Sequence, residues 1–192
     1  MTLNLKNLLN PKIKPSKMGE FQELQPIAGL QISAVSADLY GDGRDDLALF
    51  YFPKGANFAA VYTSSKITST NINWNLKIKR HFVKALMVNT QNANAFTGVK
   101  GAQGLKEIAH SLSKSLTLKS SQSPKGIDDI VKITDLLFAS TGVIGEEFPH
   151  TKIKNTIPEL VKKLRIEQNK YVWFKAASAI MTTDTKPKLA YE

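Results

Sequence analysis

A glycine-rich turn separates two apolar segments near the start of the chain. Residues 40–45, Tyr-Gly-Asp-Gly-Arg-Asp, follow a weakly alternating segment at 32–39 and precede an apolar run at 46–52. Glycine allows the positive φ angles that a tight reversal needs, so the two segments are predicted to pair as antiparallel strands. This pairing favours a sheet that begins with a hairpin rather than a doubly wound fold.

Two further strands and a helix are expected in the middle of the chain. The strands are predicted at 58–63 and 85–89, and a serine- and lysine-containing surface loop at 118–127. The apolar residues of the helix recur at i, i+3, i+4, i+7 and i+11 and share one face. They are Leu105, Ile108, Ala109, Leu112 and Leu116. Residues 130–138 could be a helix that runs into a strand, and periodicity does not decide the point.

Two helices are predicted near the end of the chain. The segment 156–159, Thr-Ile-Pro-Glu, indicates a helix start with proline in the first turn and glutamate at capping-box spacing. Its buried face is predicted to comprise Leu160, Val161, Leu164 and Ile166. The last helix is predicted at 171–181, with Trp173, Ala176, Ala177 and Ile180 on one side. Its alanines indicate close packing against another backbone, and the mixture of elements predicts an α+β fold.

Composition sets the broad class. The 192 residues are 42% hydrophobic, which allows one domain with a substantial core. Residues 1–20 are interpreted as a loose basic arm and 21–192 as the folded part. No apolar run approaches the roughly 18 residues that span a bilayer, and no secretory signal is evident. Cysteine is absent, so we expect a cytoplasmic protein without disulfides or a membrane association.

The net charge of +10 raises the question of an acidic partner. The lysines are dispersed along the chain, and the tightest basic cluster is the segment 77–81. There is no dense basic block with interleaved aromatic residues, so nucleic-acid binding is not expected. A solvated lysine-rich surface and an acidic partner chain are the remaining interpretations.

Metal-binding patterns are weak. Four carboxylates surround the glycines of residues 38–46, an arrangement similar to the calcium loops of integrin-type repeats. Those loops occur in tandem, whereas this one is single, so a charged hairpin turn is the preferred interpretation. His81, His110 and His150 form no pair at metal-ligand spacing, and no metal site is expected.

Three polar segments that follow apolar runs are the candidates for chemistry. Residues 89–98 contain three asparagines, which could form a polar site or satisfy their own backbone. In Ser140-Thr141-Gly142, a hydroxyl and a glycine N–H could stabilise an oxyanion, or cap a helix or turn. Thr182-Thr183-Asp184-Thr185 could cap the last helix or bind a substrate amine or carboxylate.

Five segments in one order resemble the ornithine acetyltransferases, the glutamate N-acetyltransferases of arginine biosynthesis. They are Asp46–Leu49, Ala60–Thr63, Asn92–Gly98, Ser140–Gly145 with Pro149, and Ala179–Asp184 with Pro187-Lys188. The resemblance covers roughly residues 25 to 190. It implies a layered α/β sandwich, of which this chain would be the N-terminal part.

The resemblance also implies a mechanism. The family's precursor cleaves itself before an internal threonine, which then carries acetyl from N-acetylornithine to glutamate. Thr141 and Gly142 match the oxyanion-hole pair, and Thr182 matches a substrate-contacting position, with Thr183 as the near alternative. The implied partners are the β chain of the same precursor, in an α2β2 heterotetramer, and the two substrates. No cofactor is expected, and acetyl-CoA is a further acetyl donor that the resemblance leaves open.

The chain departs from the family pattern after Pro187-Lys188. The glycine-rich segment, the cleavage point and the nucleophilic threonine that follow in the family are absent from this sequence. The sequence therefore predicts an incomplete α chain that is inactive alone. The alternative is a non-catalytic binding protein, either a decayed paralogue or a calcium-loop module.

Overall fold

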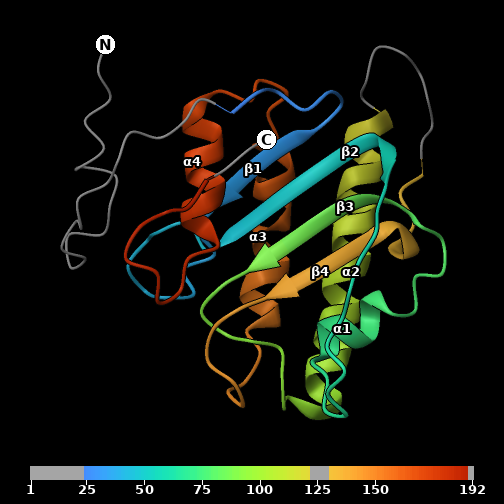
Figure 1. Ribbon diagram of the computed structural model, residues 1–192, viewed down its shortest axis with the longest axis vertical. Coiled ribbons are helices and arrows are strands. Elements are labelled where there is room, and N and C mark those ends of the chain that lie inside the picture. The colour runs from blue at the N-terminus through green and yellow to red at the C-terminus, as the bar shows by residue number, and fades with distance from the viewer. Residues whose placement is uncertain (1–23, 122–129, 190–192) are drawn as a thin grey trace.

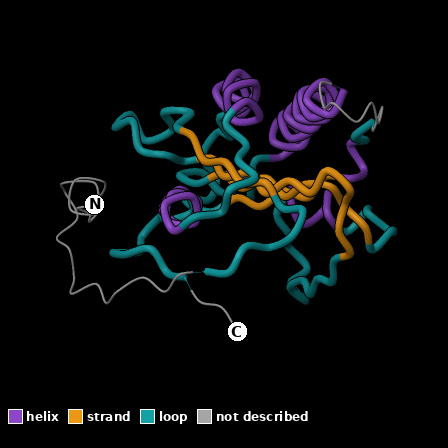
Figure 2. Tube along the Cα trace, turned by 90° about the horizontal axis from the view of Figure 1, so that it is seen from above, coloured by secondary structure: helices purple, strands orange, loops and turns teal. Residues whose placement is uncertain are grey.

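The computed structural model describes residues 24–121 and 130–189, so the arm expected at 1–20 lies outside the described residues. These residues form three layers, with two long helices on one face of a sheet and one helix on the other (Figure 2). The elements in chain order are β1 (Gln31–Val35), β2 (Leu47–Asn57), α1 (Thr70–Asn75), β3 (Phe82–Asn89), α2 (Gly98–Ser121), η2 (Ile133–Asp135), β4 (Leu136–Ser140), α3 (His150–Lys162) and α4 (Lys170–Ala179).

The four described strands form one sheet in the order β1-β2-β3-β4 (Figure 1). The first three strands are antiparallel neighbours, so the predicted hairpin between β1 and β2 is confirmed. β4 pairs in parallel with β3 after the crossover through α2, and both strands therefore end at the same edge of the sheet. The open question at 130–138 is resolved as a short 3-10 turn followed by a strand.

Side chains of β2 alternate between the two faces of the sheet, as strand geometry requires. Leu47, Leu49 and Tyr51 join the core beneath α2 and α3. Ala48 and Phe50 point to the opposite face, where α4 packs. The sheet is thus the central layer, and the larger core lies on the α2–α3 side.

The helix predicted from its apolar stripe is α2. Each of its five predicted core residues is at most 1% exposed. The helix runs on to Ser121, so the first four residues of the surface loop predicted at 118–127 are helical, and residues 122–127 lie outside the described part. Gly104 of α2 permits close contact with α3, since a Cβ there would lie 2.7 Å from the Cβ of His150.

The predicted start of α3 is wrong. The helix begins at His150, and Pro158 lies inside it rather than in its first turn. Pro158 is on the exposed side, where water can satisfy the carbonyl that proline leaves without its helical partner. Leu160, Val161 and Leu164 are buried as predicted, whereas Ile166 lies beyond the helix end and is 75% exposed.

α4 confirms the close packing expected from its alanines. Ala179 is fully buried against Ala34 and Ala48 of the sheet. Ala176 packs with Leu30 and Ile32. The predicted helix end at Met181 is two residues too late, because α4 ends at Ala179, and Ile180 lies beyond it and is 40% exposed.

The strand predicted at 58–63 is also wrong. This segment follows β2 but has no strand partner among the described residues, and Val61 is 98% exposed. Its residue types favour a strand, yet the described sheet continues directly from β2 to β3. Residue propensity alone therefore misled the prediction here.

α1, a six-residue helix that was not predicted, lies along the outer edge of β4. The Asn75 side chain donates to the Phe138 carbonyl (2.9 Å) and accepts from the Phe138 N–H (3.1 Å). The Trp74 indole N–H donates to the Leu136 carbonyl at 3.0 Å. Side chains of α1 thus occupy hydrogen-bonding positions that another strand would otherwise use.

Candidate functional site

Two of the predicted polar segments lie side by side at the ends of β3 and β4. The Thr141 N–H donates to the Asn89 carbonyl (3.1 Å), and the Val143 N–H donates to the Gln91 carbonyl (2.8 Å). The Ala93 N–H donates to the Val143 carbonyl at 2.9 Å. The parallel pairing of the strands therefore continues into the loops, which we call the oxyanion loop (residues 141–145) and the asparagine loop (residues 89–95).

Gly142 sits where the two loops approach most closely. Its φ is +136°, a region that side chains of L-residues disfavour. A Cβ at this position would lie 2.1 Å from the Gln91 carbonyl oxygen. Glycine at 142 is required both by the backbone angle and by the neighbouring backbone.

The Gly142 N–H lies between two N–H groups that are already used, those of Thr141 and Val143. Within residues 24–121 and 130–189, neither the Gly142 N–H nor the Thr141 hydroxyl has a hydrogen-bond partner. Two adjacent donors are thus left for another acceptor. An oxyanion hole needs this combination of donors on a fixed backbone.

All three asparagines of the asparagine loop are buried and make hydrogen bonds within the protein. Asn94 donates to the Gly101 carbonyl (3.2 Å) and accepts from the Thr97 hydroxyl (2.6 Å). Asn92 donates to the Glu146 carboxylate at 2.9 Å. These bonds fix the loop, and they favour a supporting role for the asparagines over direct contact with a ligand.

Thr182 and Thr183 follow α4 on the other face of the sheet. The end of α4 packs near Ala48 and Val88, so the chain emerges beside the end of β3, at the edge where the oxyanion loop also begins. Among the described residues, no hydrogen bond joins either threonine to that loop. Asp184 forms an ion pair with Lys188 at 2.6 Å.

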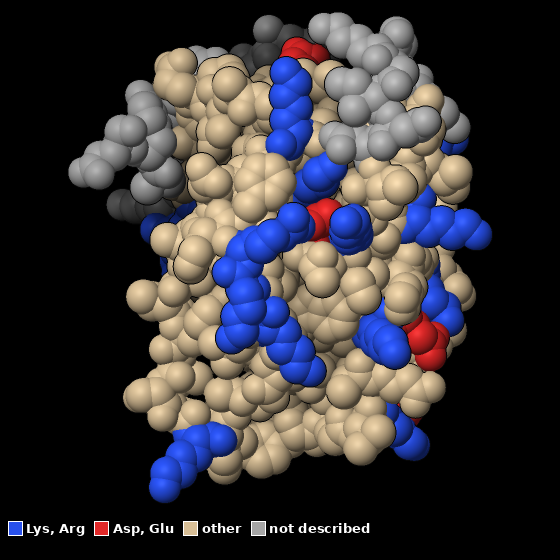
Figure 3. All heavy atoms as spheres, turned by 90° about the vertical axis from the view of Figure 1, so that its right-hand side faces the viewer, with Lys and Arg blue, Asp and Glu red and all other residues tan. Residues whose placement is uncertain are grey.

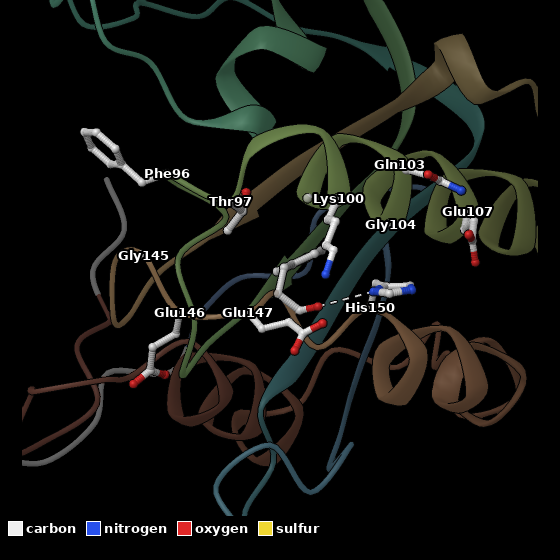
Figure 4. Close-up of a pocket in the computed structure, with 12 residues that line it drawn as sticks. Phe96, Thr97, Lys100, Gln103, Gly104, Glu107, Gly145, Glu146, Glu147 and His150 are labelled. Atoms are coloured by element: carbon white, nitrogen blue, oxygen red, sulfur yellow. Dashed lines mark hydrogen bonds between the residues drawn. The ribbon is translucent and has the colours of Figure 1, made fainter.

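A separate hollow of about 510 Å³ lies between the start of α2 and the segment 145–150 (Figure 4). Lys100 and Gln103 line it on one side, and Glu147 and His150 line it on the other. Of the oxyanion loop, only Gly145 reaches this hollow. The predicted site residues Thr141, Gly142, Thr182 and Thr183 therefore do not line it.

One carboxylate at this hollow is expected to titrate abnormally. Glu107 accepts a 2.7 Å hydrogen bond from Lys154, which lowers the pKa of Glu107 below 4.5. A lowered pKa contributes stability above pH 4.5 that is lost as the pH falls through the native pKa. We expect Glu107→Gln to lower the melting temperature slightly at pH 7 in low salt, since both groups are partly exposed. The difference should disappear in acid and in 1 M salt, and a difference that persists in both would contradict the assignment.

The acidic turn at 38–46 does not converge on a common point. The Asp46 carboxylate is buried and accepts the N–H groups of Ala37 and Leu39, both at 2.7 Å. Asp45 forms an ion pair with Lys175 at 3.0 Å. The described residues contain no group of three or more His, Cys, Asp or Glu that could hold a metal ion. These carboxylates bind groups of the protein itself, which favours the charged hairpin turn over a calcium loop.

Basic side chains are distributed widely over the surface. On the face shown in Figure 3, lysine and arginine extend from top to bottom, with a group at the centre, and clearly outnumber acidic residues. One basic residue, Arg80, forms an ion pair with Asp135 at 2.5 Å, and Asp135 is almost fully buried.

Among the described helices, none is long and apolar enough to cross a membrane.

Sequence reasoning missed one residue beside the oxyanion loop, Asn71. Asn71 of α1 donates to the Ser140 hydroxyl at 2.6 Å, and that hydroxyl donates to the Asn89 side chain at 2.5 Å. Asn71 and Asn75 are four residues apart, which places both on one helix face. This spacing could have indicated that the two side chains point the same way, but only if residues 70–75 had already been predicted to form a helix.

Solved structures share this architecture. Ornithine acetyltransferase of Mycobacterium tuberculosis, complexed with ornithine, matches with a TM-score of 0.71 and 24% identity over 85% of this chain and 83% of that one. The arginine biosynthesis bifunctional protein ArgJ of Bacillus halodurans matches with a TM-score of 0.69 and 24% identity, over 82% of this chain and 74% of that one. The fold is therefore that of the ornithine acetyltransferases, as the sequence resemblance predicted.

Sequence comparison identifies the family. The model of the ArgJ family matches residues 31–192. The arginine biosynthesis bifunctional protein ArgJ of Bartonella quintana is 37% identical over 180 residues, which is 93% of this chain and 40% of that protein. The Caulobacter vibrioides protein of the same name is 34% identical, over 89% of this chain and 39% of that one. The chain belongs to the ArgJ family and spans about 40% of the length of these curated relatives.

Proposed function

We propose that this chain forms part of an acetyltransferase of arginine biosynthesis that moves acetyl from N-acetylornithine to glutamate. The observation that carries the proposal is the pair of unbonded donors at Thr141 and Gly142, held in place by the pairing of the oxyanion and asparagine loops. The names of the relatives support the biosynthetic role. The family's further acetyl donor, acetyl-CoA, is proposed only as an alternative substrate.

The proposed reaction proceeds by two acyl transfers. A nucleophilic threonine attacks the acetyl carbonyl of N-acetylornithine, and its proton passes to a base; ornithine then leaves and the acetyl ester remains. Glutamate attacks that ester in the second transfer and restores the threonine. Each attack creates a tetrahedral intermediate, whose oxyanion would accept hydrogen bonds from the Gly142 N–H and the Thr141 hydroxyl.

The nucleophile and the substrate contacts are proposed to lie outside the oxyanion loop. We expect the nucleophilic threonine to come from the β chain, which arises by self-cleavage of the precursor, in an α2β2 assembly in the cytoplasm. Thr182, or Thr183 beside it, is proposed to contact substrate. No metal or cofactor has a role in these steps, and this chain alone is expected to be inactive.

The test uses this chain co-expressed with the C-terminal part of the Bartonella quintana relative, which we call the complemented protein. Once the two parts co-purify, transfer of labelled acetyl from N-acetylornithine to glutamate is expected. Thr141→Ala should then reduce kcat by about 10²-fold, the scale for losing one oxyanion donor.

A control variant separates loss of the hydroxyl from other effects of changing Thr141. Thr141→Ser keeps a hydroxyl and should retain most of the rate. Full rate in Thr141→Ala would show that the oxyanion assignment is wrong. A co-purified pair that transfers no acetyl would contradict the proposed function and favour the non-catalytic binding protein.

A further inference from the structure

A series of partly buried side-chain hydrogen bonds lies directly behind the oxyanion loop. It runs from Asn71 of α1 to Ser140 at the end of β4, and from Ser140 to Asn89 at the end of β3. Asn71 and Asn89 are 4% and 5% exposed. Buried polar groups of this kind form a rigid unit when all of them are satisfied.

The two residues at the ends of this series, Asn71 and Asn89, each make a further side-chain hydrogen bond. Asn71 accepts at its side-chain oxygen from Asn94 at 3.3 Å, which ties α1 to the asparagine loop. Asn89 donates from its side chain to the Asn92 carbonyl at 3.1 Å. Neither amide can therefore rotate without breaking a bond on its far side.

Asn89 connects this chain of bonds to the oxyanion loop. Its side-chain oxygen accepts from the Ser140 hydroxyl, while its backbone carbonyl accepts the Thr141 N–H at 3.1 Å. Ser140 is also the residue that precedes Thr141 in the chain. The position of the Thr141–Gly142 peptide is thus fixed from the side chain and from the backbone of the same asparagine.

We propose that Asn71, Ser140 and Asn89 form a positioning relay that holds the Thr141–Gly142 peptide rigid, so that its two free donors keep one fixed direction. These are positioning residues, because they act on the oxyanion loop and not on a substrate. Their catalytic consequence rests on the proposed function, whereas their mechanical effect on Gly142 does not.

The same helix supplies a matched control. Asn75, one turn after Asn71, also bonds β4 through its side-chain amide, but its partner Phe138 lies in the middle of the strand. Loss of Asn75 removes two hydrogen bonds between α1 and β4 without touching the relay. A purely structural role for Asn71 would make the two asparagines equivalent.

The first experiment measures backbone ¹⁵N relaxation at Gly142 in this chain. In Asn71→Ala and Ser140→Ala, the Gly142 order parameter should fall from about 0.85 to below about 0.6, the values of rigid and flexible backbone. It should stay high in Asn75→Ala, even though that variant also melts at a lower temperature. Ser140→Thr keeps the hydroxyl and should restore rigidity. Ser140→Ala deletes one atom and decides the question if Asn71→Ala fails to fold.

Two results would overturn the relay. One is a Gly142 amide that remains rigid in both Asn71→Ala and Ser140→Ala. The other is a Gly142 amide that loosens equally in Asn75→Ala, which would make the effect a general loss of stability.

The second experiment measures kinetics in the complemented protein. Ser140→Ala should lower kcat by roughly 10- to 100-fold, the scale for a misplaced catalytic group, with KM within about twofold. Asn75→Ala should leave kcat unchanged, and an equal loss of kcat in both variants would contradict the relay. If even the unmodified complemented protein transfers no acetyl, the proposed function fails, and the relaxation measurement still decides the relay.

Discussion

Gly142→Ala is expected to reduce acetyl transfer by the complemented protein by about 10³-fold, the upper scale for an oxyanion donor. The new Cβ would lie 2.1 Å from the Gln91 carbonyl oxygen, a backbone atom that cannot move aside by changing a rotamer. The φ of +136° adds strain on the order of 1–3 kcal/mol for a residue with a side chain. The loop must therefore shift, and both proposed donors shift with it. The measurements are kcat and the urea midpoint of the same preparation.

Gly145→Ala is the matched control for this substitution. Gly145 also has a positive φ, +84°, but a Cβ there meets nothing within 4 Å. It should show the conformational cost in the urea midpoint with little loss of kcat. If Gly142→Ala lost no more activity than Gly145→Ala, the close approach of the two loops would have no role in the reaction.

The second large effect is expected at Asp46, which is fully buried beside the hairpin turn. Asp46→Ala should lower the free energy of unfolding by about 2–4 kcal/mol, because the N–H groups of Ala37 and Leu39 lose their acceptors and each unsatisfied buried donor costs about 1–3 kcal/mol. Asp45→Ala is the control, since it breaks only a partly exposed ion pair with Lys175, worth about 0–1 kcal/mol. Equal losses in urea unfolding would contradict the role given to Asp46.

The pH dependence of the same residue has a defined sign. Burial raises the pKa of Asp46 above 3.8, although its two backbone hydrogen bonds oppose the shift. The native state then takes up a proton at a higher pH than the unfolded state, so this group's contribution to stability increases as the pH falls from 7 toward 3.8. Asp46→Asn removes that titration. The stability advantage of the unmodified chain over Asp46→Asn should thus grow on acidification, and a constant difference would show that the carboxyl titrates normally.

The sequence predicted most reliably those elements whose signal is local. The stripe of α2 is a single buried face, and each of its predicted residues is in the core. The turn at 40–45 likewise carries its own glycines. By contrast, α1 is a short polar helix, and much of what holds it is the bonding of Trp74 and Asn75 to residues more than 60 positions later. No pattern within six residues could report those partners.

At the candidate site, too, the residue types could be read from the sequence, whereas their contacts with distant residues could not. The residue types at Thr141 and Gly142 allowed either oxyanion donors or a cap or turn, and the hydrogen bonding of these donors depends on the asparagine loop. The two loops meet because β4 pairs in parallel with β3, with Asn89 opposite Ser140. Residue spacing does not encode that register, so the relay through Asn71 could not be predicted. The resemblance to the ornithine acetyltransferases predicted the fold because it relied on the order of five segments and not on any one of them.

The side chains of α1 along β4 restrict how this chain can join another. Asn75 satisfies the N–H and the carbonyl of Phe138, so a foreign strand would have to displace the helix to lengthen the sheet there. The opposite edge of the sheet, formed by β1, is also partly covered, because the backbone N–H and carbonyl of Ile32 are both hydrogen-bonded to the backbone of Arg165. An associating subunit consequently cannot add a strand at either of these positions unless the bonds of Asn75 or Arg165 are first broken.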